Sequence, residues 1–294
     1  MKTKVLILGS TGMLGSMMYR FFSSLTAYQV IGTVRNQNNS DKNIQYFDAQ
    51  QFLHGPKQFA FIRSFDYIIN CIGIIKPYCQ DSDPKGVQNA IEVNALFPHV
   101  LTEYCKNSPA RILQIATDCV YSGLLGQYTE KSPHDALDVY GKTKSLGEVI
   151  SPNVLHVRCS IVGPEQNTSY SLLGWFLHEP QGATLNGYTH HKWNGVTTLQ
   201  FAQLCHKIIE MNVFEKFRKI NHLYHFVPNT AVTKYELLEL FKKIFHKNVT
   251  INAVTDQKGP IDRTLATIYP AFTSLYGHMT MTQALQELQS YEKI

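Results

Sequence analysis

The fold is decided close to the start of the chain by one stretch, Val5-Leu6-Ile7-Leu8-Gly9-Ser10-Thr11-Gly12-Met13-Leu14-Gly15. Four consecutive aliphatic residues predict a strand that is covered on both faces. Three glycines follow at GxxGxxG spacing and lead into a helical pattern over residues 13–25. Glycines in such a turn permit a tight bend and the close approach of a pyrophosphate, and the helix N-terminus offers it free N–H groups. We therefore predict a dinucleotide-binding loop formed by Gly9, Ser10, Thr11, Gly12, Met13, Leu14 and Gly15.

The first half of the chain continues this alternation of short strands and helices. Strand patterns cover residues 4–8, 29–34, 43–47, 66–72, 111–117 and 154–162, and helical patterns cover 13–25, 88–106 and 137–150. Helices of this length between strands imply right-handed crossovers and a parallel sheet. The predicted fold is α/β, a doubly wound parallel sheet of the Rossmann type.

The second half departs from this rhythm after about residue 165. Glycine, asparagine, histidine and aromatic residues gather over 163–194 and predict irregular loops around a site. A helix over 199–211, a strand over 223–227 and helices over 234–245 and 282–290 follow. We expect residues 1–165 to form a dinucleotide-binding domain, with part of 195–225 returning to it. Residues 166–294 are expected to form a smaller C-terminal α/β lobe that binds substrate.

Composition places the chain among ordinary globular proteins. Of its 294 residues, 44% are hydrophobic and 17% are charged, and no apolar run approaches the roughly 18 residues of a membrane span. The apolar run that follows Lys4 is too short for a signal peptide, so we expect a cytoplasmic protein. The net charge of +5 suits a small anionic ligand and makes no case for nucleic acid or a membrane as partner. The six cysteines never occur as CxxC and the histidines lack ligand spacing, so no metal site is predicted.

The end of the second predicted strand bears on which dinucleotide binds. Sites for NAD usually carry an acidic residue there, which holds the ribose 2′-hydroxyl. In this chain the strand runs into Arg35, and no acidic residue appears before Asp41. A guanidinium can pair with a 2′-phosphate and stack on adenine. We therefore expect NADP(H), with NAD(H) as the alternative; the competing interpretation of Arg35 is a surface arginine in a loop.

A candidate catalytic pair stands in the YxxxK sequence of Tyr140 and Lys144. Residues four apart share one helical face, with Cβ atoms about 5–6 Å from each other. A tyrosine alone has a pKa near 10, and a nearby ammonium lowers that pKa. Thr117 ends the strand pattern over 111–117, and ligands of open α/β sheets bind at the carboxyl ends of strands. We therefore expect Thr117 to face the same crevice.

With these motifs in order, the chain resembles the extended short-chain dehydrogenases/reductases, and most closely their dTDP-4-dehydrorhamnose reductase group. The resemblance is strong over residues 4–163 and loose afterwards. Its matching segments are Gly9/Gly12/Gly15, Asn94 within 93–98, Thr117-Asp118-Cys119-Val120-Tyr121, Tyr140 to Glu148, Arg158 to Gly163, Gly195-Val196-Thr197-Thr198, and Lys258-Gly259-Pro260 with Thr264-Leu265. Thr197 stands where the group usually has a proline, which weakens the match in the lobe.

This resemblance implies roles for the matched residues. Tyr140 is expected to protonate a carbonyl oxygen as hydride arrives from the nicotinamide, while Lys144 binds the ribose and Thr117 hydrogen-bonds the carbonyl. Asn94 is expected to support a proton-relay water chain or the local helix geometry. The remaining cofactor contacts near the adenine and ribose are Asp48, Cys71, Ile72 and Gly73, although Asp48 and the segment 70–73 would also serve simply to end strands.

The implied substrate is a nucleoside-diphosphate 4-keto-6-deoxy sugar. The residues expected to bind it are Asp118, Cys119, Trp175, Lys192 and Trp193. Aromatic and hydrogen-bonding groups suit a nucleotide base and sugar, although Trp175 and Phe176 would also fit a helix that packs on the sheet. The resemblance further implies a homodimer formed through the helix of the Tyr/Lys pair.

Single residues bear on whether the chain has another function of this superfamily. A 4,6-dehydratase needs an acid/base pair directly after the threonine, and Cys119 replaces its second carboxylate, which argues against dehydration. A 4-epimerase uses the same tyrosine and lysine and stays open as an alternative. So does a non-catalytic dinucleotide-binding subunit, such as the regulatory subunit of methionine adenosyltransferase, although such proteins typically lack the Tyr/Lys pair.

Overall fold

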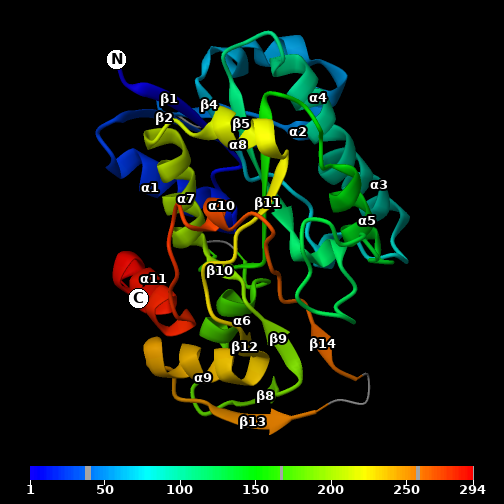
Figure 1. The fold of residues 1–294 in the computed structure, drawn as a ribbon, viewed down its shortest axis with the longest axis vertical. Coiled ribbons are helices and arrows are strands. Elements are labelled where there is room, and N and C mark those ends of the chain that lie inside the picture. Colours follow the sequence, from blue (N-terminus) through cyan, green and yellow to red (C-terminus); the bar gives the residue numbers. More distant parts are fainter. Residues whose placement is uncertain (37–40, 166–167, 256–258, 294) are drawn as a thin grey trace.

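A computed structural model describes residues 1–36, 41–165, 168–255 and 259–293. Within these residues seven strands form one central sheet in the order β11-β6-β5-β4-β1-β2-β3, and every pairing is parallel (Figure 1). The order reverses at β1, so the crevice of a doubly wound sheet opens at the carboxyl ends of β1 and β4. The strands are β1 (Thr3–Leu8), β2 (Tyr28–Val34), β3 (Ile44–Tyr46), β4 (Tyr67–Asn70), β5 (Arg111–Thr117), β6 (Val154–Cys159) and β11 (Leu223–His225).

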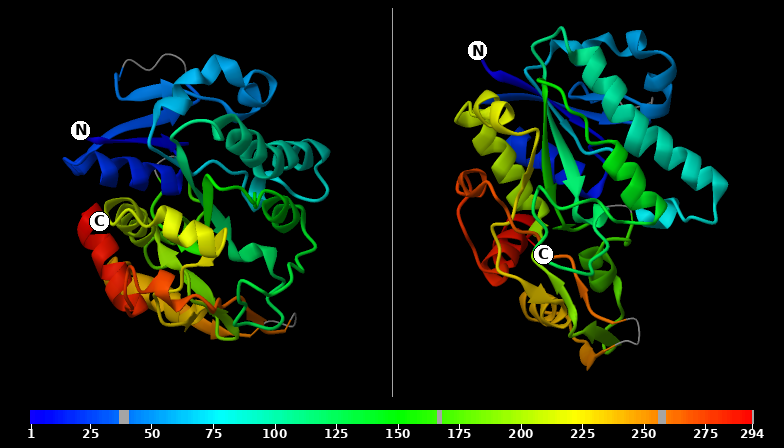
Figure 2. Two further views of the ribbon diagram at one scale, coloured as in Figure 1. Left: turned by 45° about the horizontal axis from the view of Figure 1, so that its top comes forward. Right: turned by 45° about the vertical axis from the view of Figure 1, so that its right-hand side comes forward.

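Helices cover both faces of this sheet because its strands are apolar on both sides. Along β1, Val5 and Ile7 enter the core beneath α1 and α7, whereas Leu6 and Leu8 enter the core beneath α2 and α4. The two helical layers are visible on either side of the sheet in Figure 2. One layer holds α1 (Met13–Ser24), α7 (Thr198–Glu210) and α8 (Phe214–Ile220), and the other holds α2 (Ala49–His54), α3 (Pro84–Ala90), α4 (Phe97–Cys105) and α5 (Val139–Leu146).

A smaller lobe lies at the carboxyl end of the sheet, at the bottom of Figure 1. Its strands pair as β7 with β10, β8 with β13, and β9 with both β12 and β14. Phe176 and Phe241 of the lobe belong to the same buried cluster as the residues beneath α1. The lobe contains β7 (Ile161–Val162), α6 (Leu172–His178), β8 (Thr184–Tyr188), β9 (His191–Trp193), β10 (Val196–Thr197), β12 (Val232–Thr233), α9 (Lys234–Ile244), β13 (Thr250–Val254), β14 (Ile261–Asp262), α10 (Pro270–Thr273) and α11 (Met281–Glu292).

The predicted doubly wound sheet is confirmed, with differences at the ends of elements. The pattern over 154–162 is two strands, β6 and β7. The helix predicted over 88–106 starts earlier, with Pro84 at the beginning of α3, and includes a π-helical segment, Ile91–Leu96, before α4. The helix over 137–150 is shorter because Gly147 ends α5. Among the described residues, no helix is long and apolar enough to cross a bilayer.

The prediction of irregular loops over 163–194 is wrong for the segments that form α6, β8 and β9. Residues 166–167 of this range lie outside the described part of the chain. Ser171 accepts a hydrogen bond from the Gly174 N–H and thereby starts α6. Farther along, Leu185 and Gly187 are buried between exposed neighbours, the alternation of a half-buried strand, and β8 pairs in parallel with β13 some sixty residues later. The strand was not predicted because its glycine and asparagine are typical of loops and because its partner strand is distant in the sequence.

Candidate active site

The glycine-rich turn brings α1 against the end of β1. Gly9 adopts a positive φ of 79°, which favours glycine, and its carbonyl accepts the Gly12 N–H at 3.2 Å. A Cβ on Gly15 would lie 2.0 Å from the Gly9 carbonyl oxygen, so only glycine lets the helix approach this closely. Gly12 occupies the N-cap of α1 without a side-chain cap, and the first turn carries no acidic residue. The free N–H groups and the positive end of the helix dipole therefore suit an anion.

The second strand anchors this turn. Thr33 accepts the Ser10 hydroxyl at its carbonyl (2.9 Å) and the Gly9 N–H at its side-chain oxygen (3.0 Å). Arg35 is exposed directly after β2, at the same edge of the sheet as the turn. Asp48 serves as the N-cap of α2, accepting the Gln51 N–H at 2.9 Å, a structural role other than the strand-ending one expected from the sequence.

Asn94 ties the loop after β4 to two helices. Its side chain accepts the Ile74 N–H at 2.8 Å and donates to the Ile74 carbonyl at 2.9 Å, and it also donates to the Thr143 hydroxyl on α5 at 3.3 Å. A Cβ on Gly73 would lie 3.4 Å from Asn94 Oδ1 and 3.9 Å from Lys144 Nζ, which places Gly73 beside both residues. Asn94 therefore organises local helix geometry, and it does so from a π-helical segment, a feature frequent at functional sites.

Two other residues of that strand end have different surroundings. The Ile72 N–H donates to the Asn70 side chain at 3.1 Å, so Ile72 lies within the turn that leads to Gly73. Cys71 packs against the large core cluster, and burial raises the pKa of its thiol. A neutral thiol in this position behaves as a small hydrophobic side chain.

Tyr140 lies in the first turn of α5 and is partly buried, with its phenol within hydrogen-bonding reach of Thr117 at the end of β5. Asp138 caps this helix, accepting the Gly141 N–H at 2.7 Å, and pairs with Lys76 at 2.6 Å. Lys76 Nζ lies 5.9 Å from the centre of the Tyr140 ring. The pKa of Tyr140 is raised, not lowered as the Tyr–Lys spacing predicts, because burial outweighs a hydrogen bond from Thr117 that favours the phenolate. The phenol is thus held protonated, the form that donates a proton.

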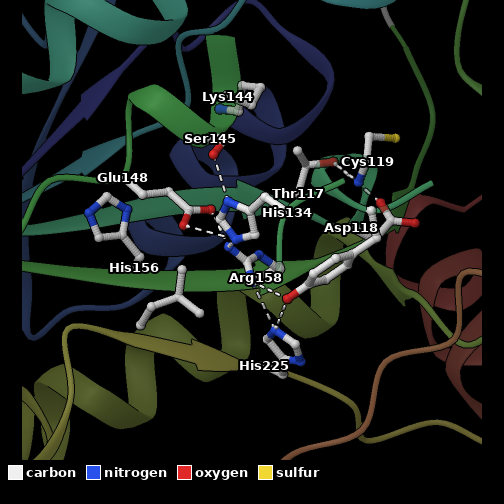
Figure 3. Close-up of polar contacts among 12 residues, drawn as sticks. Thr117, Asp118, Cys119, His134, Lys144, Ser145, Glu148, His156, Arg158 and His225 are labelled. Atoms are coloured by element: carbon white, nitrogen blue, oxygen red, sulfur yellow. Dashed lines mark hydrogen bonds and ion pairs between the residues drawn. The ribbon is translucent and has the colours of Figure 1, made fainter. Parts of the chain in front are cut away.

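Lys144 lies one turn farther along the same helix. Its Nζ donates to the Ile115 carbonyl of β5 at 3.5 Å, and burial lowers its pKa. Figure 3 shows Lys144 on α5 near the end of β5, where Thr117, Asp118 and Cys119 follow one another. The carboxyl end of β5 and the start of α5 therefore bring together the three residues predicted as catalytic.

The carboxyl group of Asp118 is buried beside Thr117 at the end of β5. The Thr117 hydroxyl donates to Asp118 Oδ1 at 3.3 Å and accepts the Cys119 N–H at 3.1 Å. Burial raises the pKa of Asp118, and the positive charges of Arg263 and Lys234 oppose that shift. Burial also raises the pKa of the Cys119 thiol to about 11, so it is neutral.

The two cations that face Asp118 were missed by the sequence analysis. Lys234 is the first residue of α9, and its Nζ lies 5.3 Å from the centre of the buried Trp193 ring. Arg263 follows β14; its Nη2 makes a long bond of 3.5 Å to the Ser122 carbonyl, and its buried Nε has no partner in the described part of the chain. Both cations reach the end of β5 from the lobe, so they place positive charge next to the predicted substrate residues.

The other predicted substrate residues are less central. Lys192 is 60% exposed and forms an ion pair with Asp262 at 3.6 Å. Trp175, on α6, packs against the core cluster that buries Phe176, which is the packing role that the sequence also allowed. Of the aromatic residues predicted for the pocket, Trp193 is therefore the one with a described contact to the charged cluster.

With this geometry in place, comparison with known proteins is informative. The family model of the RmlD substrate binding domain matches residues 3–293. The chain belongs to this family. A dTDP-4-dehydrorhamnose reductase from Clostridium acetobutylicum is 20% identical with a TM-score of 0.76, covering 99% of this chain and all of the other. The same enzyme from Bacillus anthracis, solved in complex with NADP, is 17% identical with a TM-score of 0.75, again over 99% of this chain and 100% of the other.

A relative of a different kind also matches. Methionine adenosyltransferase 2 subunit beta from Xenopus tropicalis is 25% identical over 80% of this chain and 70% of its own length. The chain is thus similar in sequence to a subunit of methionine adenosyltransferase and similar in fold to dTDP-4-dehydrorhamnose reductases. Identity at this level leaves the activity to be argued from the site.

Two segments that the sequence analysis matched to the family lie in the lobe. Thr197, at the position where a proline was expected, is fully buried and caps α7 in a reciprocal capping box with Gln200. The hydroxyl therefore replaces the proline as a helix-starting residue without loss of the element. In the late segment, Lys258 lies outside the described residues, and Thr264 and Leu265 are buried.

Proposed function

We propose that this chain is an NADP(H)-dependent reductase of a nucleoside-diphosphate 4-keto-6-deoxy sugar. Hydride passes from the nicotinamide to the keto carbon, and Tyr140 gives its proton to the carbonyl oxygen. The observation that carries the proposal is the convergence of Tyr140, Lys144 and Thr117 at the carboxyl end of β5. The glycine-rich turn lies at the carboxyl end of β1 in the same parallel sheet, where a dinucleotide would extend across the crevice.

Each of the three residues has a chemical task in this reaction. The protonated phenol of Tyr140 is the general acid, and Thr117 holds the carbonyl oxygen toward it. Lys144 binds the ribose of the nicotinamide and stabilises the phenolate that remains after proton transfer. Asn94 supports the arrangement by fixing the loop at Gly73 next to Lys144.

The cofactor assignment follows from the edge formed by β1 and β2. The free N–H groups of α1 bind the pyrophosphate, and Arg35 pairs with the 2′-phosphate that distinguishes NADP(H) from NAD(H). Residues 1–165, with part of 195–225 returning to the sheet, make up the dinucleotide-binding part in this proposal. NAD(H) is the alternative cofactor, and the affinity ratio between the two nucleotides decides between them.

The substrate assignment depends on charge at the end of β5. Lys234 and Arg263 face one carboxylate, Asp118, so the cluster carries surplus positive charge. A diphosphate is attracted by that surplus, and Trp193 offers an apolar surface beside it. Cys119 stands where a dehydratase needs a second carboxylate, which favours net reduction.

The proposal is tested by titrating the purified protein with NADPH and NADH and then adding nucleoside-diphosphate 4-keto-6-deoxy sugars while nicotinamide absorbance is followed. We expect tighter binding of NADPH, and oxidation of NADPH by at least one sugar. Tyr140→Phe should bind NADPH as the wild type does and lose turnover by about 10²- to 10⁴-fold. An active Tyr140→Phe protein would refute the assigned role.

Two other functions give different outcomes in the same experiment. Interconversion of sugar epimers without net oxidation of cofactor indicates an epimerase. Binding of dinucleotide without conversion of any sugar indicates a regulatory subunit, the function suggested by the methionine adenosyltransferase relative.

A homodimer through the outer helices is part of this proposal. Leu146, the last residue of α5, is 66% exposed, and Ile150, in the segment that follows, is 73% exposed. Ile91 and Leu96 of the adjoining π-helical segment are about half exposed. Apolar side chains gathered on one helix pair favour an interface. Sedimentation of the wild type and of Leu146→Glu tests this: the wild type should be a dimer and the variant a monomer.

A further inference from the structure

Arg158 is a fully buried cation behind the candidate active site. Its side chain is 1% exposed and lies on β6, a strand covered on both faces. It pairs with Glu148, which is 9% exposed and follows α5. Its guanidinium also donates to the Tyr121 hydroxyl at 2.5 Å, to His225 Nε2 at 3.1 Å and to His134 Nε2 at 2.9 Å (Figure 3).

These contacts determine the protonation of the two histidines. Arginine only donates, so His134 and His225 both accept at Nε2 and carry their proton on Nδ1. His134 then donates from Nδ1 to the Ser145 hydroxyl at 2.6 Å, and His225 donates to the Ala266 carbonyl at 2.7 Å. Both imidazoles are neutral in this arrangement. Among these five side chains the charge therefore resides on Arg158 and Glu148; the Glu130 carboxylate lies beside them and accepts the His225 backbone N–H at 3.0 Å.

Glu148 follows the predicted catalytic pair at the spacing of one helical turn. Tyr140, Lys144 and Glu148 are spaced four residues apart, with Gly147 ending α5 between the last two. A Cβ on Gly147 would lie 2.0 Å from the Asn94 carbonyl oxygen, so the end of α5 is pressed against the π-helical segment. The Glu148–Arg158 pair holds the other side of this helix end to β6.

Lys144 is surrounded mainly by groups that disfavour its charge or are neutral. Burial lowers its pKa, and Glu148 is the charged group of the described chain that raises it. Its titratable neighbours are Tyr140 on α5 itself and His156 on β6. Burial, together with the positive charge of Lys144, lowers the pKa of His156 to about 3, so this imidazole is neutral. Arg158 binds the Glu148 carboxylate from β6.

We propose that Glu148 is a positioning residue which, bound by Arg158, fixes the C-terminal end of α5 and places its carboxylate charge near Lys144. This inference rests on the proposed function, because it gives Lys144 a charge-dependent task there. Glu148 acts through Lys144 and touches neither cofactor nor substrate. Arg158 also acts through His134: it donates a hydrogen bond that orients the His134 ring, and His134 in turn donates to Ser145, the residue next to Lys144.

The test compares Glu148→Gln with the double variant Glu148→Gln/Arg158→Met. The single variant leaves Arg158 buried without a counter-ion and is expected to unfold easily. The double variant removes both charges and keeps the side-chain volumes similar. Glu292→Gln is the matched control, because it breaks the Arg20–Glu292 ion pair (2.5 Å, with Glu292 7% exposed) between α1 and α11, far from α5.

The primary readout is the titration of Lys144 by NMR of isotope-labelled lysine, with its signal assigned through Lys144→Arg. In the double variant the Lys144 midpoint should fall below that of the wild type, because the carboxylate charge that raises it is gone. The alkaline limb of the kcat profile should move down in parallel, with KM little changed at neutral pH. An unchanged Lys144 midpoint overturns the inference and leaves Glu148 a purely structural role, as does an equal shift in Glu292→Gln. If the wild type converts no sugar but the Lys144 midpoint still shifts, the proposed function fails while the effect of Glu148 on Lys144 stands.

Discussion

Acid should destabilise the folded protein through His156. This side chain is 1% exposed on β6, and its Nε2 donates to the Val149 carbonyl at 2.9 Å. Its Nδ1 is buried and has no partner among the described residues. Burial lowers the pKa of His156 from 6.5 to about 3, so the imidazole is neutral in the folded state throughout the range in which the protein is handled.

The sign and size of the effect follow from proton uptake. Because the folded-state pKa is the lower one, the unfolded chain binds a proton first as the pH falls. The stability contribution is complete above pH 6.5 and is lost progressively as the pH falls toward 3. A pH of about 5 lies roughly 1.5 units below the pKa of 6.5 that the imidazole has in the unfolded chain. Each of these units lowers the free energy of unfolding by about 1.36 kcal/mol, so the loss at about pH 5 is about 2 kcal/mol. That is a large part of a typical stability of about 5–15 kcal/mol.

The assay is urea unfolding at about pH 7 and about pH 5, followed by the fluorescence of Trp175 and Trp193. His156→Gln keeps an N–H donor for the Val149 carbonyl but binds no proton. Between the two pH values the wild type should lose about 2 kcal/mol more than this variant. His54→Gln, at an exposed position, should lose as much as the wild type. Equal losses in the wild type and His156→Gln would refute the reasoning.

Three further substitutions test other parts of the structure. Gly15→Ala should weaken NADPH binding at least tenfold, about 1.4 kcal/mol, because its Cβ would meet the Gly9 carbonyl at 2.0 Å; an unchanged Kd in a fluorescence titration contradicts the phosphate-loop assignment. Lys234→Met should raise KM for the nucleotide sugar about tenfold with kcat nearly unchanged, because charge beside Asp118 is lost without touching the reacting atoms; steady-state kinetics that show the reverse pattern place Lys234 in the chemical step. Thr197→Ala removes the buried cap of α7 and should cost about 1 kcal/mol in urea unfolding; no loss means that the cap is compensated.

The parts of the fold that could be predicted are those written in local patterns. The strand over 111–117 was predicted with its observed ends, because a mostly aliphatic pattern there stops at Thr117. The turn after β1 was predicted because glycines are needed there: Gly9 has a positive φ, and Gly15 packs against the Gly9 carbonyl. In the lobe, by contrast, β8 pairs with β13 and β9 with β12 and β14, and such distant pairings leave little local signal.

The charged residues that were missed did leave signals of a different kind. Lys234 is the first residue of α9, where the helix dipole disfavours a cation, so a lysine in that position indicates a nearby anion. Arg158 interrupts an apolar strand that is buried on both sides, and a buried guanidinium requires partners. Which partners these are could not be predicted, because Glu148, Tyr121 and His225 come from three separate segments that only the folded chain brings together.

The position of β11 at the edge of the sheet has a consequence for synthesis. A growing chain emerges from its N-terminus, so the phosphate loop and the whole of α5 are made before Leu223–His225 can pair with β6. Until then β6 is an open edge, and the face that α7 covers is bare apolar surface, both of which invite aggregation. While the roughly sixty residues between β6 and β11 are being synthesised, the nascent protein therefore exposes an unpaired strand and apolar core surface, to which a chaperone can bind.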